Sequence, residues 1–171
     1  MSEPTPIIYI VDDDPAVRDA VGFLVSSVGY PFEACASGAE LLQRLDNARP
    51  ACVVLDVRLP GVSGLEIQRE LQNRNSIAGV VFITGHGDVP KAVRAMRHGA
   101  IDFLEKPFDD QVLLDRISDA LQASKIALTK QGRREHMERK LGALTERERE
   151  VLALVIAGKT SKAIAADLDI S

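Results

Sequence analysis

The sequence predicts an α/β protein: a five-stranded parallel sheet, doubly wound with helices on both faces, then a long linker helix and a small all-α segment. Short apolar, β-branched runs alternate with stretches of helical periodicity through the first 120 residues. Strict alternation of this kind is typical of parallel strands joined by crossover helices. With 171 residues, 46% hydrophobic and 27% charged, the chain can bury a core without disulfide or metal staples. This composition excludes disordered, collagen-like and coiled-coil rod proteins.

Each element has its own signal. The apolar runs predict strands at 7–11, 31–35, 51–55, 79–83 and 101–104. The stretches between them predict helices at about 15–28, 38–47, 64–73 and 88–98, with a fifth starting near residue 109. Asp14 before Pro15 is typical of an N-cap followed by a first helical residue, and Ser37 with Glu40 has the spacing of a capping box.

The fifth helix is expected to run on beyond the sheet. Its pattern becomes strongly polar at 130–140, where Gly132 is the one helix breaker, so a long and partly frayed helical linker is expected. Thr145 and Glu148 then have capping-box spacing for a helix that stops at Gly158.

A second short helix is expected at about 161–168, with Ile164, Ala165 and Leu168 facing inward. Two short helices joined by a turn that contains glycine are typical of the beginning of a helix-turn-helix unit.

Charge is unevenly distributed along the chain. Residues 1–122 carry 11 Lys and Arg against 18 Asp and Glu, whereas 123–171 carry 10 against 7, so a mildly basic tail follows an acidic body.

Cys35 and Cys52 lie in apolar runs without metal-ligand spacing and are expected to be buried, reduced thiols. No apolar run is long enough for a bilayer and residues 1–6 lack a secretory signal, so a cytoplasmic protein without a membrane partner is expected.

Polar residues stand where the predicted strands end. Asp12, Asp13 and Asp14 follow the first strand, and the remaining positions are Asp56, Thr84-Gly85 and Lys106-Pro107 after the third, fourth and fifth. The carboxyl ends of parallel strands meet at one edge of a sheet, where these carboxylates would repel one another without a cation. Their hard oxygen atoms favour Mg²⁺, with Mn²⁺ as the alternative. With the Lys106 ammonium and the Thr84 hydroxyl beside them, the pattern indicates phosphoryl transfer to a carboxylate.

Four motifs together resemble the receiver domain of bacterial two-component response regulators. They are VDD at 11–13, LDVRLPG at 55–61, ITGHGDVP at 83–90 and DFLEKPF at 102–108. The resemblance covers residues 7 to about 122 and implies a flavodoxin-like sheet of order 2-1-3-4-5. Within the family, residues 84–90 and 144–171 are similar to the FixJ-like branch, whose effector is a LuxR-type helix-turn-helix.

The resemblance also implies roles for individual residues. Asp56 would be the phospho-acceptor, taking the phosphoryl group from a sensor histidine kinase, and Thr84 and Lys106 would bind that group. Phe103 would be the aromatic switch residue, acting with Thr84, and the Lys106–Pro107 peptide bond would be cis. Asp13 and Asp56 would bind Mg²⁺ directly together with the backbone carbonyl of Arg58, and Asp12 would bind it through a coordinated water.

The implied organisation is a receiver domain at 1–122, a helical linker at 123–143 and the N-terminal part of a LuxR-type DNA-binding domain at 144–171. The recognition helix is expected to lie outside this sequence, so weak and unspecific DNA binding is expected of the chain itself, and promoter binding of a longer form. Phosphorylation is expected to produce a homodimer.

Two other functions remain open at this stage. A receiver could act through protein contacts alone, but the similarity of the tail to the LuxR-type pattern favours a transcription regulator. A magnesium phosphohydrolase would use the same ion and nucleophile. Such enzymes typically carry an acid two residues after the nucleophile, where this chain has Arg58, so a signalling switch is expected rather than an enzyme.

Overall fold

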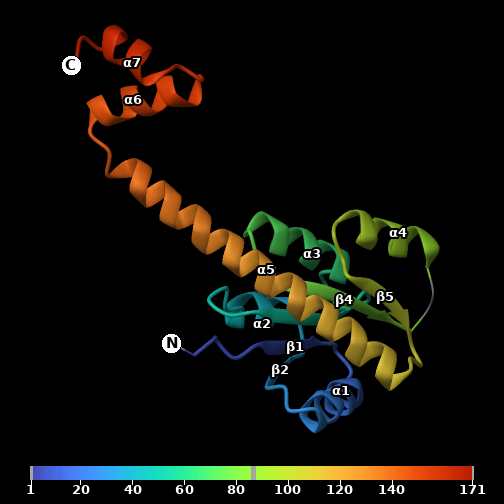
Figure 1. Cartoon of the computed structure of the whole chain (residues 1–171). Coiled ribbons are helices and arrows are strands. Elements are labelled where there is room, and N and C mark those ends of the chain that lie inside the picture. The colour runs from blue at the N-terminus through green and yellow to red at the C-terminus, as the bar shows by residue number, and fades with distance from the viewer. Residues whose placement is uncertain (1, 86–87, 171) are drawn as a thin grey trace. The chain divides into compact units, whose positions relative to one another are not determined.

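The computed structural model describes residues 2–85 and 88–170, and its N-terminal part is built on one parallel sheet (Figure 1). Its strands are β1 (Ile7–Val11), β2 (Phe32–Cys35), β3 (Ala51–Asp56), β4 (Gly79–Thr84) and β5 (Asp102–Glu105). They lie in the order β2-β1-β3-β4-β5, and every pairing is parallel. The predicted fold class and strand order are therefore confirmed.

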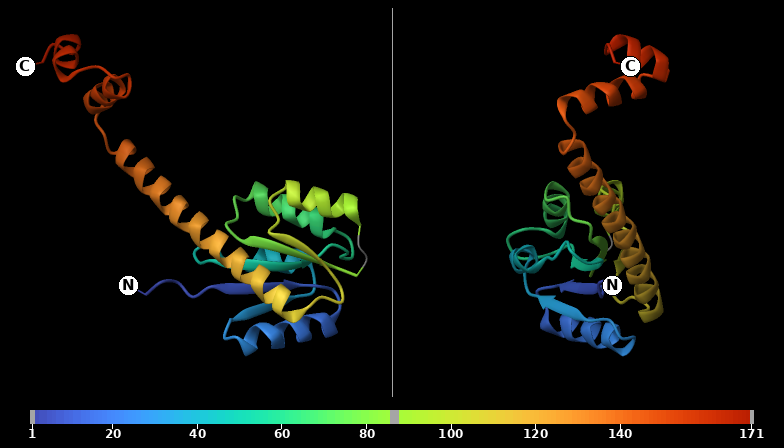
Figure 2. Two further views of the ribbon diagram at one scale, coloured as in Figure 1. Left: turned by 45° about the vertical axis from the view of Figure 1, so that its right-hand side comes forward. Right: turned by 60° about the vertical axis from the view of Figure 1, so that its left-hand side comes forward.

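Helices cover both faces of the sheet (Figure 2). They are α1 (Pro15–Ser27), α2 (Gly38–Arg44), α3 (Gly64–Asn73), α4 (Val89–Arg97) and α5 (Asp110–Gly142). Successive side chains of a strand point to opposite faces, and β1 shows the result: Tyr9 belongs to the core beneath α2, α3 and α4, and Ile8 and Ile10 to the core beneath α1 and α5. Burial on both faces explains why the strands are apolar throughout rather than alternating.

The last three strands each end one residue later than the sequence predicts. β3 and β4 each continue one residue further than predicted, to Asp56 and Thr84, and β5 is displaced by one residue to Asp102–Glu105. The reason is that the ladder continues into the polar residues: the Val57 N–H donates to the Ile83 carbonyl, 3.2 Å away. Two of the candidate site residues are thereby fixed within the sheet.

Side chains at the helix ends explain where the helices begin and stop. Asp14 caps α1 as predicted, because its carboxylate accepts a hydrogen bond of 2.9 Å from the Ala16 N–H. The helix predicted at 38–47 stops at Arg44. The Tyr9 hydroxyl donates to the Arg44 carbonyl and accepts from the Asp46 N–H, both at 3.1 Å, and so ends α2.

The long helix α5 is continuous from Asp110 to Gly142, so Gly132 does not break it. Side-chain pairs one turn apart span this position: Gln131 donates to Glu135 and Arg134 to Glu138, each at 3.0 Å. Such pairs each contribute a few tenths of a kcal/mol, which partly offsets the cost of about 1 kcal/mol for a glycine in a helix.

The chain forms two compact units that divide between Thr129 and Lys130. The second unit contains α6 (Glu146–Ile156) and α7 (Ser161–Asp167), and both predicted short helices are confirmed. Thr145 and Glu148 form the predicted capping box. Ile164 is buried, whereas Ala165 and Leu168 are only half-buried.

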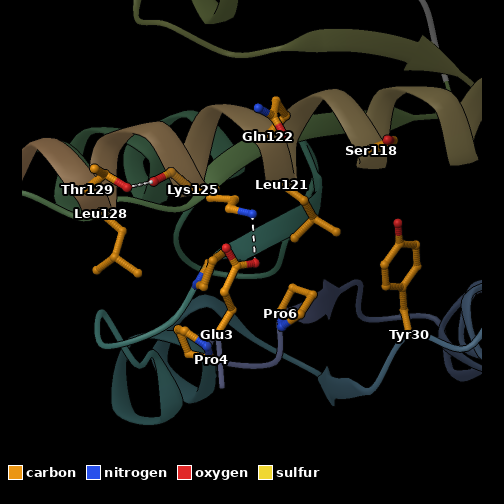
Figure 3. A pocket seen from close by; sticks show the side chains of 11 residues that line it. Glu3, Pro4, Pro6, Tyr30, Ser118, Leu121, Gln122, Lys125, Leu128 and Thr129 are labelled. Atoms are coloured by element: carbon orange, nitrogen blue, oxygen red, sulfur yellow. Dashed lines mark hydrogen bonds and ion pairs between the residues drawn. The ribbon is translucent and has the colours of Figure 1, made fainter. Parts of the chain in front are cut away.

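A cavity of about 350 Å³ lies at the amino edge of the sheet, between the N-terminal segment and α5 (Figure 3). Pro6 and Pro50, which precede β1 and β3, line it, and an ion pair of 2.8 Å joins Glu3 to Lys125 across it. Asp12, Asp13 and Asp56 stand at the carboxyl ends of their strands and so lie at the opposite edge of the sheet.

Among the described residues, no helix has both the length and the apolar character that spanning a bilayer requires.

Candidate functional site

Three aspartates meet at the carboxyl edge of the sheet. Asp12 and Asp13 directly follow β1, and Asp56 is the last residue of the neighbouring strand β3. Each offers a carboxylate oxygen, and these oxygens lie within 4.8 Å of one another. Asp12 and Asp56 are buried and Asp13 is exposed. The structure thus brings together the three carboxylates that the sequence singled out.

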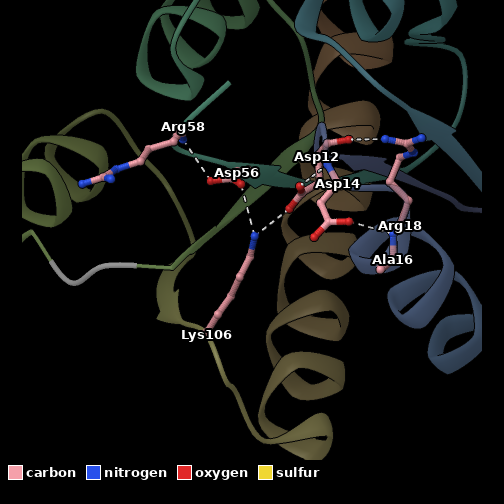
Figure 4. A network of polar contacts seen from close by, with 7 residues as sticks. All are labelled: Asp12, Asp14, Ala16, Arg18, Asp56, Arg58 and Lys106. Carbon is pink, nitrogen blue, oxygen red and sulfur yellow. Dashed lines mark hydrogen bonds and ion pairs between the residues drawn. The ribbon is translucent and has the colours of Figure 1, made fainter. Parts of the chain in front are cut away.

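Lys106 joins two of these carboxylates (Figure 4). Its Nζ donates to Asp12 Oδ2 at 2.7 Å and to Asp56 Oδ2 at 3.1 Å. The aspartate side chains are 1% and 9% exposed and the lysine side chain 23%, so solvent screens these contacts only weakly. The Lys106 N–H donates to the Thr84 carbonyl at 2.7 Å, and the peptide bond to Pro107 is cis. The loop after β5 is therefore anchored with its ammonium over the aspartates.

Backbone donors hold the two buried carboxylates in place. Asp12 Oδ1 accepts from the Asp14 N–H and Asp56 Oδ1 from the Arg58 N–H, both at 2.9 Å. Each bond is made by the residue two positions further along, so the local turn fixes the side chain without help from distant residues. Arg18 on α1 also donates to the Asp12 carbonyl at 2.7 Å, a contact for which the sequence gave no signal.

Burial, hydrogen bonds and neighbouring charges shift the pKa values of Asp56 and Lys106. Burial raises the pKa of the Asp56 carboxyl, against opposing hydrogen bonds from the Arg58 N–H and the Lys106 ammonium, and the nearby charge of Asp12 adds to the rise. Burial opposes the charged form of Lys106, but its hydrogen bonds to both aspartates raise its pKa above the usual value. The ammonium is therefore the stable form, and it partly neutralises the carboxylates.

The three aspartates suit a divalent metal ion. All donor atoms are hard carboxylate oxygens, which is the ligand chemistry of Mg²⁺ and Mn²⁺. Within the part of the chain that the structure describes, the Asp13 carboxylate has no hydrogen bond or ion pair. Its oxygens are thus available as ligands, and one monovalent ammonium leaves the cluster with net negative charge. The acidic pocket can hold a metal ion.

Thr84 and Phe103 lie on the neighbouring strands. Thr84, 1% exposed, ends β4 one residue after Ile83, the register partner of Asp56. Phe103 on β5 is half-buried, and its ring centroid lies 6.0 Å from that of Phe82 at an interplanar angle of 37°. The histidine and glycine at 86 and 87, which belong to one of the quoted motifs, lie outside the described residues.

An acidic cluster bridged by a lysine, at the carboxyl edge of a sheet of order β2-β1-β3-β4-β5, defines a receiver domain of the response-regulator class. Comparison with known families agrees: residues 8–118 match the response regulator receiver domain, and residues 134–171 match the bacterial regulatory proteins of the luxR family. The chain belongs to the response regulators that join a receiver domain to a LuxR-type DNA-binding domain and regulate transcription.

Two named proteins align with this chain over its full length. It is 41% identical to the transcriptional regulatory protein FixJ of Azorhizobium caulinodans over 171 residues, which is 100% of this chain and 81% of that protein. It is 39% identical to the response regulator protein TodT of Pseudomonas putida, covering 100% of this chain and 75% of that protein.

Solved structures give the same result. The response regulator StyR matches with a TM-score of 0.85 and 39% identity, over 98% of this chain and 85% of StyR. Full-length FixJ from B. japonicum matches with a TM-score of 0.64 and 37% identity, over 99% of this chain and 83% of FixJ.

Proposed function

We propose that Asp56 is the phospho-acceptor and that a sensor histidine kinase is the donor. The observation that carries this proposal is the position of Lys106, which contacts Asp56 at 3.1 Å and Asp12 at 2.7 Å. Of the three clustered carboxylates, only that of Asp56 combines a lysine contact with a place at the end of a central strand beside Thr84. A nucleophile needs such a neighbourhood, because a phosphoryl group brings negative charge that must be neutralised.

In the proposed reaction, a carboxylate oxygen of Asp56 attacks the phosphorus of a phosphohistidine. The new P–O bond forms as the P–N bond breaks. The phosphohistidine carries a proton on its other ring nitrogen, so the histidine side chain leaves as a neutral imidazole. The product is an acyl phosphate on Asp56. The Lys106 ammonium and the Thr84 hydroxyl would hold two of the phosphoryl oxygens, one by charge and one by a hydrogen bond.

The metal site would be formed by Asp13 and Asp56 directly, by the backbone carbonyl of Arg58, and by Asp12 through water. A bound Mg²⁺ neutralises charge on the transferring phosphoryl group. The chain itself orients Asp56 through the Arg58 N–H, at 2.9 Å, and orients Asp12 through the Asp14 N–H. In this proposal the chain is a switch: Asp56 is phosphorylated and the acyl phosphate is later hydrolysed, and the chain does not turn over a substrate repeatedly.

Substitution of Asp56 tests the assignment. Asp56→Asn should abolish labelling by radioactive phosphoramidate in the presence of Mg²⁺, while Asp14→Asn, which changes a carboxylate that serves as the α1 cap, should retain it. Asp13→Ala should lose Mg²⁺ binding and labelling together. Labelling of the Asp56→Asn protein at the wild-type level under native conditions would show that the acceptor is another residue.

We further propose that phosphorylation moves Thr84 towards the phosphoryl group and lets Phe103 turn inward, which favours one of two existing conformations. The conformation so favoured would dimerise and change the action of the LuxR-type segment on promoter DNA. Beryllofluoride, a phosphoryl mimic, should double the mass seen by light scattering. An unchanged mass, together with unchanged amide exchange across β4, α4 and β5, would contradict the switch.

We assign the receiver to residues 1–122, the helical linker to 123–143 and the LuxR-type segment to 144–171. The linker assignment is supported by α5, which continues through residue 142. The third segment is supported by the helix pair α6 and α7 and by the family match at 134–171, which covers the segment but begins within the C-terminal part of α5.

A further inference from the structure

A groove of about 510 Å³ lies next to the aspartate cluster, bounded by the loop after β3, by α3 and by α4. Its floor is apolar: Val57, Leu59 and Leu65 line it, and each is at most 9% exposed. The volume is that of a site for one small molecule, and an apolar floor favours a ligand with an organic part. The groove is separate from the acidic pocket described above.

Basic side chains form the rim of this groove. Arg58 comes from the loop after β3, Arg69 from α3, and Lys91 and Arg94 from α4. Lys91 is paired with Asp88 at 3.0 Å. Across residues 2–85 and 88–170, the guanidinium groups of Arg58, Arg69 and Arg94 have no hydrogen bond or ion pair. Three cations from three different elements therefore face one groove, and among the described residues none of them forms a direct ion pair.

Among the described residues, Glu66 supplies the one carboxylate that lines the groove, and it already accepts hydrogen bonds. Glu66 Oε2 accepts from the Ser63 N–H at 2.8 Å and from the Ser63 hydroxyl at 2.9 Å, as part of the capping box of α3. These hydrogen bonds hold the pKa of Glu66 below its usual value, and the charges of Arg69 and Arg94 contribute in the same direction. Glu66 is therefore an anion committed to its helix cap, and positive charge remains in excess along the groove.

We propose that this groove binds a small organic phosphate that carries at least two negative charges. A guanidinium pairs with phosphate oxygens through parallel N–H donors, so Arg69 and Arg94 can hold phosphate groups from opposite walls. The organic part would cover Val57, Leu59 and Leu65. The Arg58 side chain points away from Asp56 (Figure 4). A phosphate group bound to Arg58 would therefore lie away from the aspartate cluster, whose carboxylates would repel it. This inference does not depend on phosphorylation of Asp56.

The test compares two double variants that remove the same charge from the same two helices. Arg69→Gln/Arg94→Gln alters the groove, whereas Arg74→Gln/Arg97→Gln alters arginines of α3's C-cap and α4's last turn that do not line it. Adenosine triphosphate serves as the probe, titrated calorimetrically into the full chain in Mg²⁺-free buffer. We expect binding that weakens at least tenfold in the groove variant, less than threefold in the control variant, and further with added salt.

Two outcomes would overturn the proposal: no binding of the probe to the wild-type chain, or an equal loss in both variants, which would indicate diffuse charge attraction. Inorganic tripolyphosphate should bind more weakly than the nucleotide, since it leaves the apolar floor uncovered, and equal affinity would contradict the role of the floor. Circular dichroism checks folding. Phosphoramidate labelling of Asp56 should persist in the groove variant, so this proposal and the proposed function can fail separately.

Discussion

Replacement of Gly64 by alanine tests whether the Asp56 loop depends on close packing against α3. Gly64 is the first residue of α3, and its N–H donates to the Val57 carbonyl at 2.9 Å. A Cβ at this position would lie 2.2 Å from the Asp56 carbonyl oxygen and 3.0 Å from the Val57 Cα. Both neighbours are backbone atoms, so no side-chain rotation can relieve the contact.

The size of the effect follows from these distances. Non-bonded carbon atoms rest about 3.5 Å or more from their neighbours, so α3 and the loop must separate by roughly 1 Å. Overpacking of this kind costs about 1–3 kcal/mol of unfolding free energy. A displacement of about 1 Å in a group that must be aligned for reaction costs roughly 100-fold in rate. Gly64→Ala should therefore be moderately less stable and strongly impaired in phosphorylation.

Urea denaturation and the initial rate of phosphoramidate labelling measure the two effects on the same protein. Gly132→Ala is the matched control, because its Cβ would meet no atom within 4 Å and it lies in the helix α5. The control should gain about 0.5–1 kcal/mol and label at the wild-type rate. Wild-type stability and labelling in Gly64→Ala would refute the claim that this contact positions Asp56, the proposed acceptor.

Three further predictions concern charge and burial. Lys106→Met should lower the free energy of unfolding by about 3 kcal/mol in metal-free buffer, because two buried carboxylates lose their partner. Added Mg²⁺ should restore part of this free energy, and an unchanged urea midpoint would contradict a stabilising role for the Lys106 contacts. Glu66→Gln should be less stable than wild type at neutral pH. The folded-state pKa of Glu66 is lowered by its helix-cap hydrogen bonds, so this difference should fade as the pH falls through that value, and a gap that persists at low pH would be inconsistent with it. Burial raises the pKa of Cys35 to about 11 and that of Cys52 further, so a thiol reagent should modify both only after denaturation.

Hydrophobic periodicity was sufficient to predict the elements of the first unit, because burial on both faces of the sheet leaves a simple pattern. The alternation of Tyr9 and Ile10 between two cores is a direct result of strand geometry. The convergence of Asp12, Asp56 and Lys106 also followed from their positions after strands. Periodicity alone gave no strand order, which came from the resemblance of the motifs to a family. The bridging contact of Lys106 likewise depends on loop geometry that no pattern specifies.

The contacts of polar residues within helices were the part of the structure that the sequence pattern could not predict. Gln68 is a polar residue of α3, yet it is only 3% exposed. Its Nε2 donates to the carbonyls of Ala95, at 2.9 Å, and His98, at 3.2 Å, at the end of α4. These acceptors are 27 and 30 residues away in the chain, so no local pattern could identify them. The same limit concealed the basic groove, whose rim is assembled from three elements.

These contacts give the site a physical connection to α4. The loop that carries Asp56 is tied to α3 by the bond from the Gly64 N–H to the Val57 carbonyl, and α3 is tied to α4 by Gln68. A change at Asp56 that moves its loop must therefore displace α3 or break a hydrogen bond of about 2.9 Å. The basic groove lies between the same three elements, so a ligand held by Arg69 and Arg94 would resist their relative movement. Binding in the groove and phosphorylation of Asp56 would then be thermodynamically linked, each changing the equilibrium of the other by the same factor.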